Sequence, residues 1–141
     1  MMFFINPVIK AVAYDETDQI IAEKEITTAS KPSKIELTVD RNNINADGDD
    51  LAFITVNLKD KDNNFCPTAD NLISFKVEGA GDLLAVGNGN PTSLESYQGN
   101  ERKLFNGLCL LIVRSTKNAG QINISATSPG LKESNIVVVT N

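Results

Sequence analysis

The sequence predicts an all-β chain, in which a Greek-key β-sandwich of about seven short strands follows an N-terminal β-hairpin. Three observations lead to this prediction. Apolar residues alternate with polar ones in several short segments, as they do in strands that bury one face. Clusters of Gly, Asn, Asp and Pro separate these segments. No segment shows a helical period over a window of about 11 residues.

The first two strands form the hairpin. Residues 8–14 (VIKAVAY) and 19–26 (QIIAEKEI) flank a polar loop at residues 15–18. An isolated two-stranded hairpin is marginally stable in water, and unpaired strand edges attract partners. We therefore expect the hairpin to dock on the sandwich or to pair with a second copy of itself.

A polar segment with one proline, residues 27–33, separates the hairpin from the rest of the chain. The domain boundary is placed there, with residues 1–32 as hairpin and linker and residues 33–141 as the sandwich. The strands expected in the sandwich are 34–40, 51–59, 72–77, 82–86, 108–114, 121–127 and 134–140. Residues 108–114 are almost all apolar, which is typical of a central strand that is buried on both faces.

Composition excludes several classes of function. The net charge is −5 and the 13 basic residues are scattered, which argues against binding to nucleic acid or to an anionic membrane. The absence of histidine removes Ser–His and Cys–His nucleophile pairs and the commonest metal ligand. The apolar run at residues 1–5 is too short for a signal peptide or a membrane span. We expect no cofactor, no metal site, no nucleic-acid partner and no membrane partner.

Two cysteines, Cys66 and Cys109, allow one disulfide or two free thiols. Cys109 lies in the middle of an apolar strand, where a buried thiol acts as a small apolar side chain. Cys66 lies in the turn-like segment 63–67 (NNFCP). The sequence leaves both states open.

Two loops contain residue types that bind ligands in other proteins. The acidic loop 45–50 (NADGDD) could offer oxygen ligands to calcium, but it lacks the EF-hand spacing and the closing Glu. Asx side chains form such turns without metal by bonding nearby amides, and a structural turn is the preferred interpretation. Loop 87–91 (GNGNP) is followed by no helix and no Lys-Ser/Thr pair, so a phosphate-binding role is not expected. Its Gly and Asn residues allow positive φ.

The long loop before strand 108–114 is the candidate binding surface, since loops on a rigid sandwich carry function. An aromatic residue near an arginine can form a sugar platform or an interface hot spot, whereas Phe105 can instead anchor the loop to the core. The candidate interface or sugar-facing residues are Asn88, Asn90, Glu95, Tyr97, Arg102 and Phe105. Most of the 18 carboxylates lie in turn segments rather than in an evident acid–base pair. We assign no catalytic residue.

Residues 86–113 (VGNGNPTSLESYQGNERKLFNGLCLLIV) and 126–131 (ATSPGL) resemble the C-terminal immunoglobulin-like domain of bacterial β-galactosidases of glycoside hydrolase family 2. Residues 35–60 match the same domain, which in turn resembles the invasin and intimin modules. The first thirty residues resemble the end of the domain that precedes it. The resemblance covers nearly the whole chain; its motif at residues 105–108 (FNGL) is fairly specific, whereas the rest is generic to sandwiches.

The resemblance implies an immunoglobulin-like fold and a non-catalytic accessory role in a parent glycosidase of which this chain is a piece. In that family the catalytic glutamates belong to a TIM-barrel domain that this chain does not contain, so no catalytic residue carries over. The implied partners are the other domains of the parent. The hairpin edges add a second copy of the chain as a candidate partner, and the loop around Tyr97 adds an oligosaccharide. The implied location is the periplasm or the cell exterior. The family's turn around Cys66 needs no thiol, which favours free cysteines.

Two other functions stay open. A stand-alone carbohydrate-binding module would bind an oligosaccharide at Tyr97, and Tyr97→Ala should abolish that binding. The 6% aromatic content and the absence of tryptophan count against it. An invasin-like adhesion module should occur in tandem copies, and the chain shows no internal repeat.

Overall fold

The chain forms eleven β-strands and no helix over residues 7–141, the part that the computed structural model describes. The strands are β1 (Val8–Tyr14), β2 (Ile20–Thr27), β3 (Lys34–Val39), β4 (Asn43–Ile44), β5 (Leu51–Lys59), β6 (Leu72–Gly79), β7 (Gly81–Gly87), β8 (Glu101–Lys103), β9 (Leu108–Ser115), β10 (Gly120–Thr127) and β11 (Ser134–Thr140). In the same range no helix could cross a membrane. The N-terminal run that we considered as a leader, residues 1–5, lies outside the described residues.

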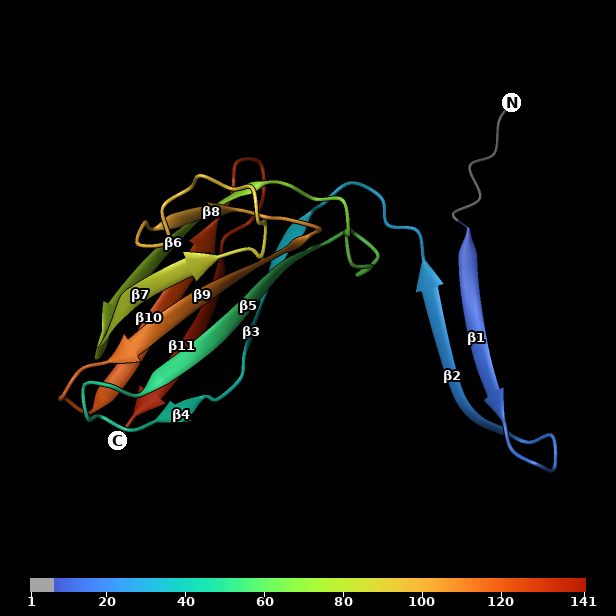
Figure 1. Ribbon diagram of the computed structural model, residues 1–141, viewed down its shortest axis with the longest axis horizontal. Coiled ribbons are helices and arrows are strands. Elements are labelled where there is room, and N and C mark those ends of the chain that lie inside the picture. The colour runs from blue at the N-terminus through green and yellow to red at the C-terminus, as the bar shows by residue number, and fades with distance from the viewer. Residues whose placement is uncertain (1–6) are drawn as a thin grey trace.

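Two sheets pack face to face as an immunoglobulin-like sandwich (Figure 1). The four-stranded sheet has the order β3-β5-β9-β7, and the five-stranded sheet has the order β4-β11-β10-β6-β8. The first order is that of strands A, B, E and D of the immunoglobulin fold, and β6, β10 and β11 take the places of C, F and G. The predicted Greek-key sandwich is confirmed.

The core lies between the two sheets and follows from the period of two along each strand. The fully buried apolar side chains of the four-stranded sheet include Ala52, Ile54, Val56, Leu58, Leu111 and Val113. Those of the five-stranded sheet include Ile73, Ile122, Ala126 and Val138. A slip of one residue in any pairing would turn these side chains to the outside, so burial fixes the register.

The prediction that residues 108–114 are buried on both faces is wrong. β9 is an inner strand of its sheet, but only its alternate residues are buried. Leu108 is 41% exposed, and Leu110 and Ile112 are partly exposed on the outer face. The sequence shows that these side chains are apolar, whereas the described chain leaves them partly exposed.

Two strands were not predicted. β4 pairs with β11 in parallel through two residues, and β8 pairs with β6 through three. Segments this short carry no visible alternation, since a period of two needs about four residues to show. β8 is the more important omission, because it carries Arg102 into the five-stranded sheet opposite Ile73.

Both cysteines are free and buried, which confirms the free-thiol alternative. Cys66 is 3% exposed and Cys109 is 2% exposed. Burial raises the pKa of the Cys109 thiol to about 12, so this thiol stays protonated at neutral pH. Burial raises the pKa of Cys66 as well. The thiols therefore act as small apolar side chains in this fold.

The hairpin stands apart from the sandwich (Figure 1). In the described residues β1 and β2 pair only with each other, as a separate two-stranded sheet. Ile9 is 72% exposed and Ile26 is 61% exposed. The first of the two alternatives for the hairpin, docking on the sandwich, is therefore wrong for this structure. Pairing with a second copy stays a prediction.

The inner face of β9 makes a direct test of the core. Leu111→Ala should lower the free energy of unfolding by about 2–5 kcal/mol, because it leaves a cavity between two packed sheets. Leu94→Ala is the matched control, since Leu94 is fully exposed and its truncation should change stability by less than about 0.5 kcal/mol. Chemical denaturation of both variants measures the difference. Equal effects would contradict the assignment of Leu111 to the core.

Candidate functional site

The loop between β7 and β8, residues 88–100, crosses from the four-stranded sheet to the five-stranded sheet. We call it the crossing loop. The Val86 amide donates to the Tyr97 carbonyl oxygen at 2.8 Å, which holds the loop along the β7 edge. Asn90 accepts from the Thr92 amide at 3.0 Å in a local Asx turn. Gly89 has φ of +73°, as the composition of the loop led us to expect.

Arg102 organises the crossing loop from within the protein. Its side chain is completely buried. Nη1 donates to the Glu95 carbonyl oxygen at 3.1 Å, and Nη2 donates to Asn88 Oδ1 at 3.0 Å. The guanidinium carbon lies 4.8 Å from the centre of the Tyr97 ring, in the range of a cation–π contact. Four of the six candidate residues therefore form one cluster.

The rest of the cluster fastens the crossing loop to β8. Glu95 Oε1 accepts from the Lys103 amide at 2.9 Å, and Oε2 accepts from the Ser93 hydroxyl at 2.8 Å. The Lys103 amide is the main reason why the pKa of Glu95 lies below its usual value. Asn88 Nδ2 donates to the Lys103 carbonyl oxygen at 2.8 Å. These polar groups are used inside the loop, and Arg102 has no exposed surface to offer a sugar.

The other two candidates lie outside this cluster. Asn90 is half-buried in its own turn. Phe105 is 36% exposed, and the neighbouring Leu104, at 3% exposed, is the residue that enters the core. The anchoring role considered for Phe105 therefore belongs to Leu104.

The motif at residues 105–108 is a tight turn that leads into β9. Phe105 and Leu108 exchange backbone hydrogen bonds of 2.9 and 3.1 Å. Asn106 and Gly107 have φ of 51° and 77°, the left-handed values that a two-residue type I′ turn needs. A Cβ on Gly107 would collide with the Cys66 carbonyl oxygen. The motif is specific because turn geometry and close packing both require it.

Asp60, at the end of β5, holds the linker against the sandwich. Its side chain is fully buried, and Oδ2 accepts from the Ser30 amide at 2.8 Å. Oδ1 accepts from the amides of Asn64 at 2.8 Å and Asp62 at 3.0 Å. These donors, Ser30 first, hold the pKa of Asp60 far below its usual range. We call this arrangement the linker latch. The sequence could have predicted the local turn at residues 60–64, but not the contact across 30 residues.

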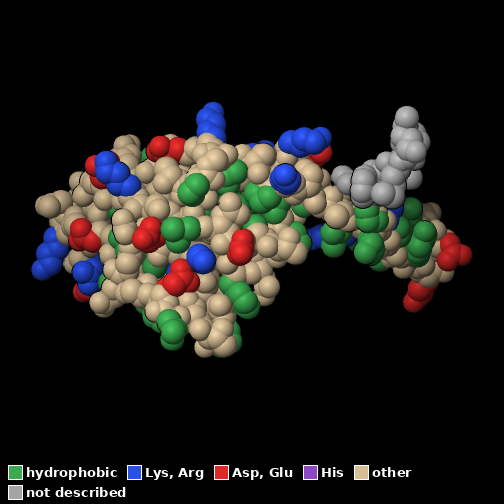
Figure 2. Space-filling model, turned by 90° about the horizontal axis from the view of Figure 1, so that it is seen from above, with side chains coloured by type: hydrophobic (Ala, Val, Ile, Leu, Met, Phe, Trp, Pro, Cys, Tyr) green, Lys and Arg blue, Asp and Glu red, His purple; other side chains and the backbone are tan. Residues whose placement is uncertain are grey.

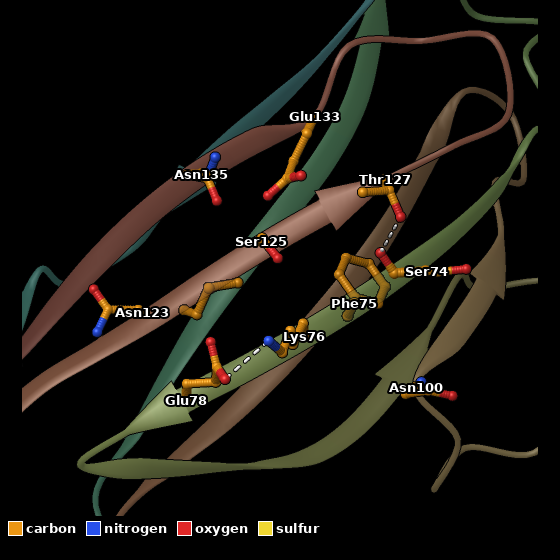
Figure 3. Close-up of a pocket in the computed structure, with 11 residues that line it drawn as sticks. Ser74, Phe75, Lys76, Glu78, Asn100, Asn123, Ser125, Thr127, Glu133 and Asn135 are labelled. Carbon is orange, nitrogen blue, oxygen red and sulfur yellow. Dashed lines mark hydrogen bonds and ion pairs between the residues drawn. The ribbon is translucent and has the colours of Figure 1, made fainter.

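A shallow trough of about 550 Å³ lies on the outer face of the five-stranded sheet (Figure 3). Its lining is polar and includes Ser74, Lys76, Glu78, Asn100, Asn123, Ser125, Thr127, Glu133 and Asn135. Lys76 and Glu78 form an ion pair of 2.9 Å on the surface. Phe75 is 4% exposed, so its ring gives the trough no face for stacking on a sugar.

The acidic loop is a self-contained turn. Asp47 Oδ1 accepts from the amides of Asp49 at 2.9 Å and Asp50 at 2.8 Å. Asp50 accepts from the Asn45 amide and pairs with Arg41, each at 2.8 Å. The carboxylates serve the backbone, as the structural interpretation requires. Within residues 7–141 no group of three or more acidic or thiol side chains is placed to hold a metal ion.

The architecture defines the class, an immunoglobulin-like β-sandwich module. The D00-D0 domain of intimin has the same fold, with a TM-score of 0.59 and 19% identity over 95% of this chain and 64% of that one. Residues 35–137 match the family described as glycoside hydrolase family 2 C-terminal domain 5. The chain belongs to that family.

Two relatives give the scale of the likeness. The β-galactosidase BoGH2A of Bacteroides ovatus is 46% identical over 118 residues, which are 84% of this chain and 14% of that protein. A crystal structure of a glycosyl hydrolase family 2 member from Bacteroides cellulosilyticus has a TM-score of 0.89 and 36% identity. The match covers 98% of this chain and 18% of the chain in that structure. The chain therefore spans about a seventh of the β-galactosidase that it matches.

Replacing Arg102 should loosen the crossing loop. Arg102→Met keeps much of the buried volume but leaves Asn88 Oδ1 and the Glu95 carbonyl oxygen without these donors, at a cost of about 1–3 kcal/mol. Chemical denaturation measures the loss, and faster amide exchange in residues 88–100 locates it. The control is Arg114→Met on an exposed side chain, which should change stability by less than about 0.5 kcal/mol. Unchanged amide exchange in residues 88–100 would contradict the role of Arg102 in holding the crossing loop.

Asp60→Asn should weaken the linker latch in a pH-dependent way. Because the pKa of Asp60 in the folded chain lies below its ordinary value of 3.8, its contribution to stability is complete above about pH 4. That contribution is lost as the pH falls through the folded-state pKa. The variant should be less stable than the parent sequence at pH 7, and the gap should narrow as the pH falls below about 4. Denaturation curves between pH 7 and pH 2 measure it.

Asp62→Asn is the control for this experiment. The Asp62 carboxylate lies within bonding distance of Lys61 alone among the described side chains and is half exposed. Its replacement should leave stability nearly unchanged. A gap for Asp60→Asn that stays constant down to pH 2 would contradict the assigned ionisation.

Proposed function

We propose that this chain is the non-catalytic accessory C-terminal module of a family 2 glycosidase of β-galactosidase type, and that its function is to make contacts with the other domains of that enzyme. One observation carries the proposal: the hairpin exposes apolar side chains on a short sheet that nothing in the described chain covers. Figure 2 shows hydrophobic side chains gathered over this hairpin.

The distribution of apolar and charged side chains over the two faces of the hairpin indicates which face would be buried in the core of another domain. One face carries Ile9, Ala11, Ala13, Ala22, Lys24 and Ile26, in which Lys24 alone is charged. The opposite face mixes the apolar Val8, Val12 and Tyr14 with charged side chains, among them the ion pair between Lys10 and Glu23 at 2.8 Å. Since side chains alternate between faces, five apolar residues of six on one face indicate a strand pair that belongs to a larger sheet.

We assign residues 1–32 to the end of the preceding domain and its linker, and residues 33–141 to the module itself. The linker latch supports this division, because Asp60 binds the chain at Ser30, directly before the proposed boundary. A tethered hairpin on a latched linker is suited to fix the orientation of two neighbouring domains.

The parent enzyme would supply the catalytic residues, and this chain none. Its location follows from the parent, which we place in the periplasm or outside the cell. A sugar contact is the less supported role for the crossing loop. Tyr97 is 60% exposed and still available, but the arginine beside it is committed to the interior.

The proposal is tested by introducing charge on the apolar face of the hairpin. Ile9→Glu should destabilise the full-length enzyme by about 2–5 kcal/mol if this side chain is in the core of the preceding domain. In the isolated 141-residue chain, where Ile9 is 72% exposed, the same change should cost less than about 0.5 kcal/mol. Thermal unfolding of both proteins provides the comparison.

Gln19→Glu is the control, because it adds the same charge at an exposed position where β2 begins. It should leave both proteins unchanged. If Ile9→Glu leaves the enzyme as stable as Gln19→Glu does, the hairpin is not part of another domain's core and the proposal fails.

A further inference from the structure

The two outer faces of the sandwich differ in character. The outer face of the five-stranded sheet is polar over β6 and β10, where it carries Ser74, Lys76, Glu78, Asn123, Ser125 and Thr127, and β11 adds the exposed Val137 and Val139. The outer face of the four-stranded sheet carries a row of apolar side chains over β5, β7 and β9. We call this row the apolar stripe; it consists of Phe53, Leu84, Leu108, Leu110 and Ile112.

The strand register makes the stripe continuous. Phe53 lies directly opposite Ile112, and residues that face each other in an antiparallel pair share a face. Ile112 is also opposite Ala85 in β7, next to the irregularity that includes Leu84. On Phe53, Leu84 and Leu108, between 37% and 41% of the surface is exposed. A lone exposed apolar residue is ordinary, but a row of them across three strands is not.

Two residues of the candidate site extend the stripe. Gly87 lies opposite Leu110, and a Cβ on Gly87 would be 3.9 Å from the Tyr97 ring, so Tyr97 covers the sheet where the side chain is missing. Phe105 pairs with Leu108 at the start of β9. Tyr97 is 60% exposed and Phe105 is 36% exposed. The aromatic residues that sequence reasoning selected therefore border the same surface.

We propose that the apolar stripe, with Tyr97 and Phe105, is a docking face for another folded part of the same polypeptide. The inference rests on the proposed function, because it takes the chain to be a module of a longer enzyme. It adds a second contact, separate from that of the hairpin. None of the stripe residues lines the groove between the hairpin and the sandwich, whose wall includes Ile9, Ile26 and Phe65.

The tether between domains of one polypeptide, and the length of that polypeptide in the relative, favour this occupant over a second copy of the chain. The exposed part of these seven side chains amounts to an apolar area on the order of 500 Å². Two separate molecules need about 800 Å² of total surface from each partner for a stable complex, of which about 450 Å² is apolar, so the area of the stripe would serve either occupant. Domains of one chain hold together with less, since the tether keeps them at a high effective concentration. In the β-galactosidase relative, this segment is 14% of the chain, so most of the polypeptide is available as the partner.

Hydroxyl-radical footprinting of the isolated chain and of the full-length polypeptide tests the inference. Phe53, Tyr97 and Leu108 should be oxidised at least about fivefold more slowly in the full-length protein. Val137 and Val139, exposed on the outer face of the five-stranded sheet, provide the internal reference and should change little. Equal rates for the stripe in both proteins would overturn the proposal, and so would a natural polypeptide without further folded parts.

A pair of variants assigns the partner. Phe53→Lys should lower the unfolding midpoint of the full-length protein and restore fast oxidation of Tyr97, whereas Ser125→Lys, the matched change on the other face, should do neither. A different result would be that the stripe residues are protected from oxidation in the isolated chain and lose that protection on dilution. This result would assign the face to a second copy and overturn the proposal. Protection of the stripe together with a failed Ile9→Glu test would reject the role of the hairpin and leave the stripe standing.

Discussion

The pairing of β5 with β9 is the interaction on which the rest of the structure depends. Its inner face supplies Ile54, Leu111 and other fully buried side chains to the core. The end of β5 places Asp60 where it can bind the linker, and the turn before β9 requires the tight glycine at position 107. The outer face of the same pair carries much of the apolar stripe. One strand pair thus connects the core, the linker latch and the proposed docking face.

Most of the strands could be predicted from the sequence, because a sheet with one buried face produces alternation with a period of two. β4 and β8 could not, since two or three residues show no period. The error at β9 is more informative. Its outward side chains are apolar, and sequence patterns do not distinguish burial within a domain from burial between domains. If the proposed docking face is correct, the excess of apolar residues in β9 reflects contact with another domain.

The grouping in the crossing loop was partly predictable and its chemistry was not. Asn88, Glu95, Tyr97 and Arg102 are close in sequence, and they meet in space. The burial of the arginine depends on the pairing of β8 with β6, a partner about 30 residues away along the chain. The linker latch joins Ser30 to Asp60 across a similar separation. Contacts of this range are decided by topology, which local patterns do not encode.

The bonding of the polar side chains in this chain supports a role in contacts between domains rather than in catalysis. Many charged and amide side chains at the loops are bound to backbone groups or to each other, as in the arginine cluster, the acidic loop and the linker latch. What these interactions stabilise is the position of two apolar surfaces, the hairpin and the stripe. A surface held in place before it meets its partner loses little conformational entropy on docking. Rigid loops therefore make a small apolar area sufficient for an interdomain contact, and this connects the internal polar network to the function that we propose.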